Sequence, residues 1–408
     1  MTSMFSRAGA GLLALLVATS GAGQTVGELL PAWQRGGLDI HHINTGEGAA
    51  AFFVLPDGTT LLVDCGDGAE IARAPRYKSP RKPDESRMPG EWVARYLQKV
   101  QPGGTSAPVD FLVISHFHPD HMGGVPELLR HVTVRTVLDR GWPDYGAPLP
   151  FAGPLAPRYR AALRDQVDHH QATIERFRAG AADQIRLRHT PADFPGFSVR
   201  NLAVNGEAWT GVGTEVRARF PAGQKIDENP HSAAFRLTYG TFDYFTGGDI
   251  PGSSPDPAQP AWTDMESAIA WATGPVDVAV LNHHGNADAS TPFFLSVLQP
   301  RVCIAQVWAA KQLDPVTLAR LQSDRIYPGP RDLFATNGLW AGRAEHLIEL
   351  LGEAQARAHL EKLNALAATQ GHCVVRVAPG GARYQVLVLD DSDESLRIRS
   401  IHGPYASR

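Results

Sequence analysis

Hydrophobic residues along the chain gather in short runs, separated by polar segments rich in Gly and Pro. Runs of apolar and β-branched residues predict strands, and apolar residues at helical spacing predict helices. Strands are predicted at 38–43, 50–55, 60–64, 110–115, 134–138, 233–238, 241–246, 276–281, 302–307, 373–377 and 384–389. Helices are predicted at 91–101, 126–131, 155–178 and 344–368. Two successive sets of strands indicate an α/β fold in which two sheets stack between helices.

The N-terminal residues show a different pattern. Arg7 precedes an apolar run over 8–18 and then small residues, which is the layout of a secretory signal peptide. The run is shorter than the roughly 20 residues of a spanning helix, so we expect no membrane span in the mature chain. We predict a signal peptide at 1–23, the alternative being a buried or disordered leader. A signal peptide implies export to the periplasm or the extracellular space. The rest of the chain is predicted to form a main domain at 24–343 and a helix-and-strand extension at 344–408 that packs on it.

Composition narrows the class of protein. A chain of 408 residues with 43% hydrophobic content is a folded protein, neither disordered nor fibrous. The 38 Lys and Arg against 42 Asp and Glu give a net charge of −4, which argues against a broad basic surface, so no stable nucleic-acid complex is expected. Cys65, Cys303 and Cys373 are odd in number and far apart, which allows at most one disulfide and no zinc knuckle.

Candidate chemistry is concentrated in the segment that follows the predicted strand at 110–115. This segment, His116-Phe117-His118-Pro119-Asp120-His121, contains three imidazoles and one carboxylate. In a loop leaving a strand, His116 and His118 can face one point while Asp120 and His121 face another, which suits two divalent ions side by side. Imidazole and carboxylate ligands select zinc, manganese or iron, and zinc is the first candidate.

The same segment resembles the His-x-His-x-Asp-His signature of the metallo-β-lactamase superfamily. Residues 60–66 look like the early strand and Asp-x-Gly turn of that family, and 245–249 look like its Gly-Asp strand end. The resemblance implies an αββα sandwich of two mixed sheets between helices. It also implies that Asp249 bridges two metals and that a late histidine completes the second site. The pair His283-His284 supplies that histidine; we favour His284 as ligand and His283 as the group that orients the leaving group, although the two roles could be exchanged.

Within the superfamily, residues 56–64, 229–232 and 283–286 look most like the hydrolase domain of the DNA-uptake protein ComEC and its stand-alone relatives, which include a secreted phosphorylcholine esterase. Two positions depart from that branch, because this chain has His118 where an acid is usual and His231 where an amide is usual. The resemblance to the broader superfamily then assigns His231 to the first metal site. The alternative is an ordinary loop histidine.

The implied ligand set predicts an exported dinuclear hydrolase in which a metal-bridging hydroxide attacks the substrate and Asp120 orients the water and accepts a proton. Asp64 is expected to support a ligand histidine. The favoured substrates are phosphodiesters, and a basic loop with Arg73, Arg76, Lys78, Arg81 and Lys82 is either a local anion-binding surface or a solvated linker. Metal motifs do not select a substrate, so hydrolysis of lactones, esters or β-lactams stays open. A non-catalytic binding protein with the same fold is the third possibility. The implied ligands are His116, His118, His231, Asp120, His121, Asp249 and His284.

Overall fold

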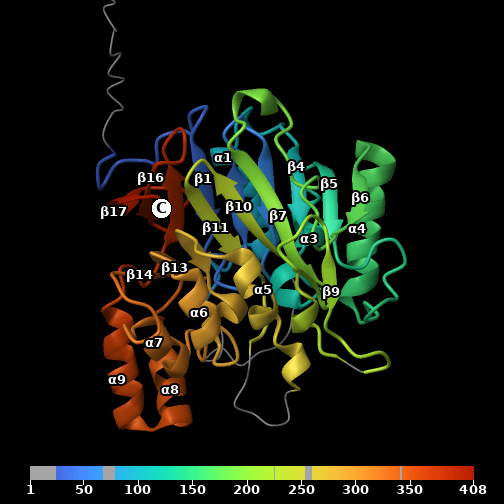
Figure 1. Ribbon diagram of the computed structural model, residues 1–408. Helices are drawn as coiled ribbons and strands as arrows, with labels where there is room; N and C mark the ends of the chain where they lie inside the picture. The colour runs from blue at the N-terminus through green and yellow to red at the C-terminus, as the bar shows by residue number, and fades with distance from the viewer. Residues whose placement is uncertain (1–23, 68–78, 225, 253–259, 341) are drawn as a thin grey trace, which may run out of the picture.

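Two β-sheets lie face to face, and helices cover the outer surface of each (Figure 1). The computed structural model describes residues 24–67, 79–224, 226–252, 260–340 and 342–408. The predicted signal peptide at 1–23 lies outside the described residues. The layering confirms the predicted αββα architecture of two mixed sheets between helices. Among the described helices, none combines the length and the apolar character that crossing a bilayer requires.

The first sheet has the strand order β17-β16-β15-β1-β2-β3-β4-β5-β6. Neighbouring strands are antiparallel from β17 to β3 and parallel from β3 to β6. The C-terminal strands join this sheet because β15 pairs with β1, so the end of the chain continues the sheet that its first strands begin. The strands are β1 (Leu38–His42), β2 (Ala51–Val54), β3 (Thr60–Val63), β4 (Val109–Val113), β5 (Val134–Asp139), β6 (Thr173–Arg176), β15 (His372–Val377), β16 (Arg383–Leu389) and β17 (Ile398–Ala406).

The second sheet has the strand order β14-β13-β12-β11-β10-β7-β8-β9. Strands β11 to β14 are parallel, and the rest of the sheet is antiparallel. The strands are β7 (Phe197–Val204), β8 (Glu207–Trp209), β9 (Val216–Ala218), β10 (Ala234–Tyr239), β11 (Phe242–Thr246), β12 (Val278–Val280), β13 (Val302–Ala305) and β14 (Asp332–Ala335).

Apolar side chains fill the space between the sheets and beneath the helices. Between the sheets, the ring of Phe53 on β2 lies 6.2 Å from that of Phe235 on β10 and 5.4 Å from that of Tyr244 on β11. Helices α1, α3 and α4 share a core with the first sheet, α5 and α6 share one with the second, and α7 and α9 pack beside β13 and β14. The helices are α1 (Pro89–Val100), α2 (Pro119–Met122), α3 (Val125–Leu128), α4 (Leu155–His170), α5 (Met265–Thr273), α6 (Pro292–Leu298), α7 (Pro315–Leu321), α8 (Arg343–Leu351) and α9 (Glu353–Asn364).

Two predicted helices differ from the structure. The helix predicted at 155–178 is wrong beyond His170, because Gln171 adopts a left-handed conformation with φ 58° and the chain then forms the edge strand β6. Phe177 therefore packs between the sheets instead of continuing a helical face. The helix predicted at 344–368 is two helices, since Gly352, with φ 80°, separates α8 from α9.

Strand β1 carries two histidines on opposite faces of the first sheet, and both are buried. His41 Nδ1 lies 3.0 Å from the Tyr96 hydroxyl on α1, while His42 Nε2 lies 3.0 Å from the Tyr244 hydroxyl of the second sheet. Burial lowers the pKa of His41 to about 4 and that of His42 to about 3. Both histidines are thus neutral parts of the core.

The sandwich brings the ends of strands from both sheets to one region. Residues following β4 in the first sheet meet residues following β11, β12 and β13 in the second. Side chains at the carboxyl ends of parallel strands are free to converge because the backbone leaves the sheet there. The predicted site residues come from these loops, except His231, which lies just before β10.

Candidate metal centre

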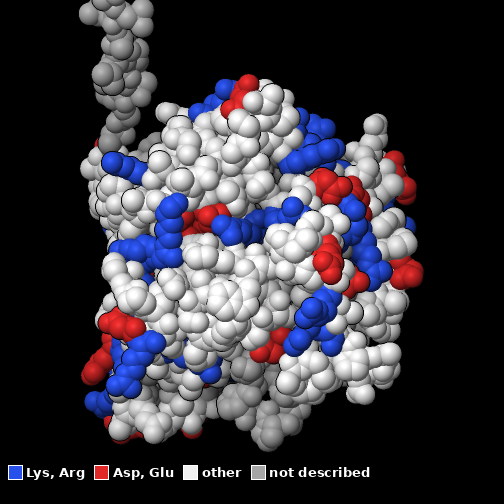
Figure 2. All heavy atoms as spheres, viewed as in Figure 1, with Lys and Arg blue, Asp and Glu red and all other residues white. Residues whose placement is uncertain are grey.

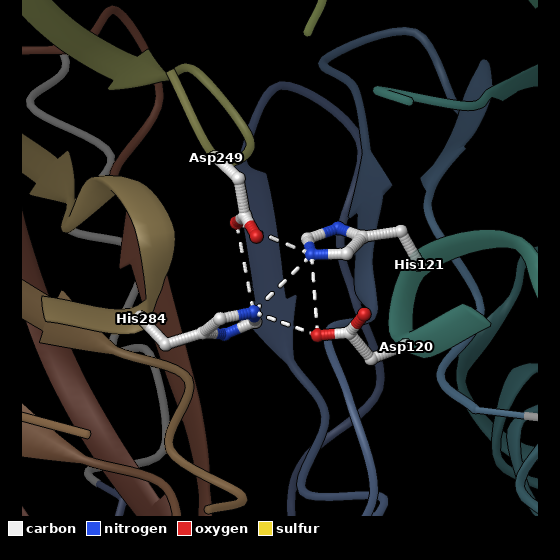
Figure 3. Close-up of side chains that lie close together, drawn as sticks. All are labelled: Asp120, His121, Asp249 and His284. Carbon is white, nitrogen blue, oxygen red and sulfur yellow. Dashed lines mark hydrogen bonds and ion pairs between the residues drawn. The ribbon is translucent and has the colours of Figure 1, made fainter. Parts of the chain in front are cut away.

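Four side chains from three segments converge at this end of the sandwich, as Figure 3 shows. Asp120 and His121 lie on α2, which directly follows β4, Asp249 follows β11, and His284 lies in the turn Asn282–Gly285 after β12. Their ligand atoms all lie within 4.8 Å of one another, and all four residues are buried.

Oxygen and nitrogen atoms in this group face one another closely. His121 Nε2 lies 3.2 Å from Asp249 Oδ1 and 3.2 Å from His284 Nε2. His284 Nε2 lies 3.2 Å from Asp120 Oδ2 and 3.5 Å from Asp249 Oδ1. Asp249 Oδ1 is buried and has no hydrogen-bond partner of suitable geometry. Such an arrangement of electron-pair donors is what a divalent cation requires.

Partners on the far side of each ring define which nitrogen is free. His121 Nδ1 lies 2.7 Å from Asp64 Oδ2, and His284 Nδ1 lies 2.8 Å from the carbonyl oxygen of Gln306. A neutral imidazole that donates through Nδ1 has its lone pair on Nε2. Both Nε2 atoms then direct their lone pairs into the cluster. The indole Nε1 of Trp308 lies 3.4 Å from His284 Nε2. Asp64 thus supports a predicted ligand.

The cluster also has a surplus of negative charge. Burial by itself lowers the pKa of His121, but the carboxylates of Asp249, Asp64 and Asp120 outweigh it and raise that pKa well above the usual value. Burial opposes ionisation of Asp249, yet the neighbouring histidines hold its pKa well below the usual range. Without a cation the carboxylates therefore stabilise a proton on an imidazole. The donor set fits a divalent metal, which supplies positive charge and accepts the lone pairs.

A second group shares one carboxylate with the first. The ligand atoms of His116, His118 and Asp249 lie within 4.8 Å of one another. His116 Nε2 lies 3.1 Å from His118 Nδ1 and 3.7 Å from Asp249 Oδ2, whereas Asp249 directs Oδ1 toward His121. Burial, with His121 as the next contributor, lowers the pKa of His116 well below its usual value, so its ring is neutral. Asp249 is placed between the two groups.

His231, the remaining predicted ligand, belongs to neither group. Its ring is buried, packs at 5.0 Å from that of Phe220, and has no hydrogen-bond partner on either nitrogen. Burial, followed by the charge of Arg140, lowers its pKa to about 3. Two unpartnered nitrogens in a buried ring are costly. The ligand role of His231 stays a prediction.

A buried ion pair that was not predicted from the sequence supports the second group. Glu228 Oε1 accepts hydrogen bonds from the Phe117 amide at 2.7 Å and from Arg140 Nε at 2.6 Å. The Arg140 guanidinium, whose side chain is fully buried, lies 4.4 Å from the Phe117 ring. Phe117 separates His116 from His118, so this pair holds the segment that carries both histidines. Three distant segments meet here, and no local pattern indicates it.

His283 lies beside the cluster rather than in it. Its Nδ1 is 2.8 Å from Asp288 Oδ1, and its Nε2 is 3.2 Å from the Asn229 amide and 4.0 Å from Asp249 Oδ2. His283 and His284 both have left-handed backbones, with φ of 49° and 55°, which non-glycine residues seldom adopt. The strained turn directs the two neighbouring rings to different places, 6.4 Å apart. Strain of this kind is found at functional sites.

A cavity of about 570 Å³ opens over these residues. Its floor includes predicted site residues, and its far wall comes from the segment after β13 and from α8. The floor has His118, Pro119, Asp120, Asn229, Asp249, His283, His284 and Asn286, and the wall has Trp308, Ala309, Ala310, Lys311, Gln312, His346 and Leu350. Of the predicted basic loop, Arg81 pairs with Glu47 at 3.1 Å, and Arg73, Arg76 and Lys78 lie outside the described residues.

The cysteines take no part in this site. Cys65, Cys303 and Cys373 are all free and buried. Cys65 lies next to Asp64, and burial, with the charge of Asp64, raises the pKa of its thiol beyond its usual range. It is a small buried side chain, as expected.

Comparison with known proteins finds a family match over part of the chain. Residues 44–199 match the family model described as the metallo-beta-lactamase superfamily. No curated protein matches the sequence. Similar solved structures include a mutant of the CmlA beta-hydroxylase, with 14% identity, a TM-score of 0.37 and coverage of 67% of this chain and 46% of that one. This chain thus spans less than half of that protein.

Two further structures are covered more completely. One is Zn(2+)-bound PqqB from Methylobacterium extorquens, with 13% identity, a TM-score of 0.36 and coverage of 65% of this chain and 88% of that one. The other is the short form of human tRNase Z, with 12% identity, a TM-score of 0.31 and coverage of 73% and 92%. The matched family model spans β2 to β6 and includes the His-x-His-x-Asp-His segment, so this part of the chain is similar to the metallo-beta-lactamase superfamily.

Proposed function

We propose that this protein is an exported hydrolase of phosphodiesters that depends on two divalent metal ions, zinc in the first instance. Two groups of ligand atoms that share Asp249 support the dinuclear part of the proposal. When bound, two such ions lower the pKa of a water molecule toward neutrality and polarise the phosphoryl oxygen. His116 and His118 would hold one ion, for which His231 is the predicted third ligand, and Asp120, His121 and His284 would hold the other.

The charge of the residues that line the cavity is the observation on which the proposed substrate class rests. Among the described residues that line it, the carboxylates are Asp120 and Asp249, and both belong to the proposed ligand set. Lys311 adds an exposed ammonium group, and Asn229 and Asn286 add amide donors. A cavity with these donors and without a free carboxylate suits an anion, and a phosphodiester carries one negative charge beside its scissile bond.

The chain's own residues would position and protonate this substrate. Asp120, at the cavity floor, would orient the attacking water and accept its proton. His283 also lines the cavity, and Asp288 holds its Nδ1. Burial lowers the pKa of His283, but Asp249 and Asp288 outweigh it and raise that pKa above its usual value. When protonated, the ring would direct positive charge toward the leaving group.

The face drawn in Figure 2 and the net charge favour a small phosphodiester over a polynucleotide. On the face drawn in Figure 2, basic and acidic side chains intermingle and no continuous basic surface appears. The net charge of −4 agrees with this. Proteins that track a nucleic-acid backbone need a basic groove for its repeated phosphates.

The test is metal content by elemental analysis, followed by hydrolysis of bis-p-nitrophenyl phosphate with and without chelator. We expect two equivalents of metal and turnover that chelation abolishes and added metal restores. Asp120→Asn should abolish turnover while circular dichroism stays unchanged. Chelator-sensitive hydrolysis of a lactone or β-lactam without phosphodiester turnover would contradict the proposed substrate class. Protein that cannot be loaded with metal would contradict the dinuclear mechanism.

Export has its own test. The full chain should be expressed in a Gram-negative host, and the N-terminus of the periplasmic product determined by mass spectrometry. We expect a mature chain that begins near Gln24. An intact leader on cytoplasmic protein would contradict export.

A further inference from the structure

We infer that α8 and the segment 308–312 form an apolar subsite beside the metal centre. The substrate is then an anionic ester whose hydrocarbon arm lies against Leu350 and whose charged group lies beside Lys311. The inference rests on the proposed function and specifies its substrate.

Helix α8 presents one face to the body of the protein. Arg343, His346, Leu347 and Leu350 follow the spacing i, i+3, i+4 and i+7, so they share one side of the helix. Arg343, His346 and Leu347 on this side are buried, whereas the exposed fraction of Leu350 is 55%. Leu350 nevertheless lines the cavity over the metal centre. The side of α8 that faces the protein therefore ends at Leu350, whose exposed side chain is available to contact a ligand.

Arg343 joins this helix to the opposite side of the wall. Its guanidinium donates to the carbonyl oxygens of Ala310 at 3.2 Å, Gln312 at 2.5 Å and Gly338. All of these partners are backbone carbonyls, and burial lowers the pKa of Arg343 to about 9. The Gln312 side chain in turn accepts from the amides of Trp308 and Ala309, at 2.7 and 2.9 Å. The wall is thus held in place before any ligand binds.

The cavity has two chemically different sides. Its floor has the metal-ligating residues and amides described above, whereas Trp308, Ala309, Ala310 and Leu350 give the wall an apolar surface. Lys311 is exposed in the same segment. A cavity of about 570 Å³ has the size of a small-molecule site, in which apolar contacts bind and a few polar groups orient. A hydrocarbon arm on the wall would leave the ester group over the floor.

The test measures binding separately from turnover. Methyl-, butyl- and hexylphosphonate, which are not esters, are titrated into the metal-loaded protein by calorimetry. Burying a methylene group stabilises by about 0.8 kcal/mol, so we expect affinity to rise by up to about fourfold per methylene. Leu350→Ser should remove most of this rise. Ile348→Ser is the matched control, since Ile348 lies on the same helix, is 40% exposed, and does not line the cavity.

A second pair of variants tests whether the charge of Lys311 contributes to binding of the anionic group. Lys311→Ala should weaken all three phosphonates by a similar factor and leave the dependence on chain length intact. Lys362→Ala, on the exposed surface of α9, should have no effect. Equal affinity for methyl- and hexylphosphonate would overturn the inference, as would equal losses in Leu350→Ser and Ile348→Ser. So would single-stranded DNA binding more tightly than hexylphosphonate, because it would indicate a polynucleotide site.

The two proposals fail in different ways. If affinity rises with chain length but bis-p-nitrophenyl phosphate is not hydrolysed, the subsite stands and the phosphodiesterase assignment falls. If that substrate is hydrolysed but affinity is the same for every chain length, the function stands and the subsite is refuted. Retention of the wild-type melting temperature by Leu350→Ser would show that its loss of binding is local.

Discussion

Replacing Glu228 with glutamine tests whether the buried ion pair with Arg140 holds the second group of candidate metal ligands, which contains His116 and His118. The carboxylate accepts from both the Arg140 guanidinium and the Phe117 amide, and the Arg140 side chain is fully buried. Glutamine keeps the size of the side chain and an oxygen for the Phe117 amide. It removes the charge that compensates the guanidinium.

The expected magnitude follows from burial. Breaking a buried ion pair by removing one charge costs about 3–5 kcal/mol, because the other charge stays buried without its partner. Since Glu228 keeps 12% of its side chain exposed, we expect the lower end, about 3 kcal/mol. Arg140→Met in the Glu228→Gln background removes the uncompensated charge, so the double variant should recover part of this loss.

The assay is urea unfolding of the wild type, both single variants and the double variant, followed by titration with zinc. Loss of the ion pair should loosen the segment that carries Phe117, and should weaken the binding of one of the two metal equivalents by about 10–100-fold, as is usual when the groups supporting a ligand are lost. A Glu228→Gln protein within about 0.5 kcal/mol of the wild type, with both equivalents bound at wild-type affinity, would refute the reasoning.

Three further predictions concern the metal cluster and the core. Asp249→Asn should lose both metal equivalents by elemental analysis, and His284→Ala one, because Asp249 belongs to both groups; two equivalents in Asp249→Asn would show that the ligand set is wrong. Asp64→Asn should weaken metal affinity by about 10–100-fold in a chelator competition, since it removes the charged acceptor of His121 Nδ1. The pKa of His42 is about 3 in the fold because of burial, below the ordinary value of 6.5. Its contribution to stability is therefore complete above pH 6.5 and falls as pH decreases, by about 2 kcal/mol at pH 5. His42→Gln should reduce the pH dependence of urea unfolding, whereas His169→Gln, with a side chain that is 70% exposed, should not.

The local pattern of apolar residues along the chain predicted much of the fold. The predicted strand runs correspond to eleven strands of the two sheets, because apolar and β-branched stretches between turn residues favour strands. Strands β6, β7, β8, β9, β14 and β17 were not predicted. The helix predictions failed where helical spacing crossed a local break. Apolar residues at 174 and 177 continue a helical pattern on paper, but a left-handed Gln171 ends α4 and the next residues pair with β5.

The sequence by itself also indicated the densest part of the candidate metal centre, because His116, His118, Asp120 and His121 lie within six residues after one strand, and short-range backbone geometry is enough to bring them near one another. Only the tertiary structure decided which other residues lie beside these four. Asp249 and His284 arrive from the other sheet, Glu228 and Arg140 come from separate loops, and Leu350 comes from a helix near the end of the chain. Contacts between distant segments depend on how side chains fill the space between the two sheets, and no spacing along the chain encodes that packing.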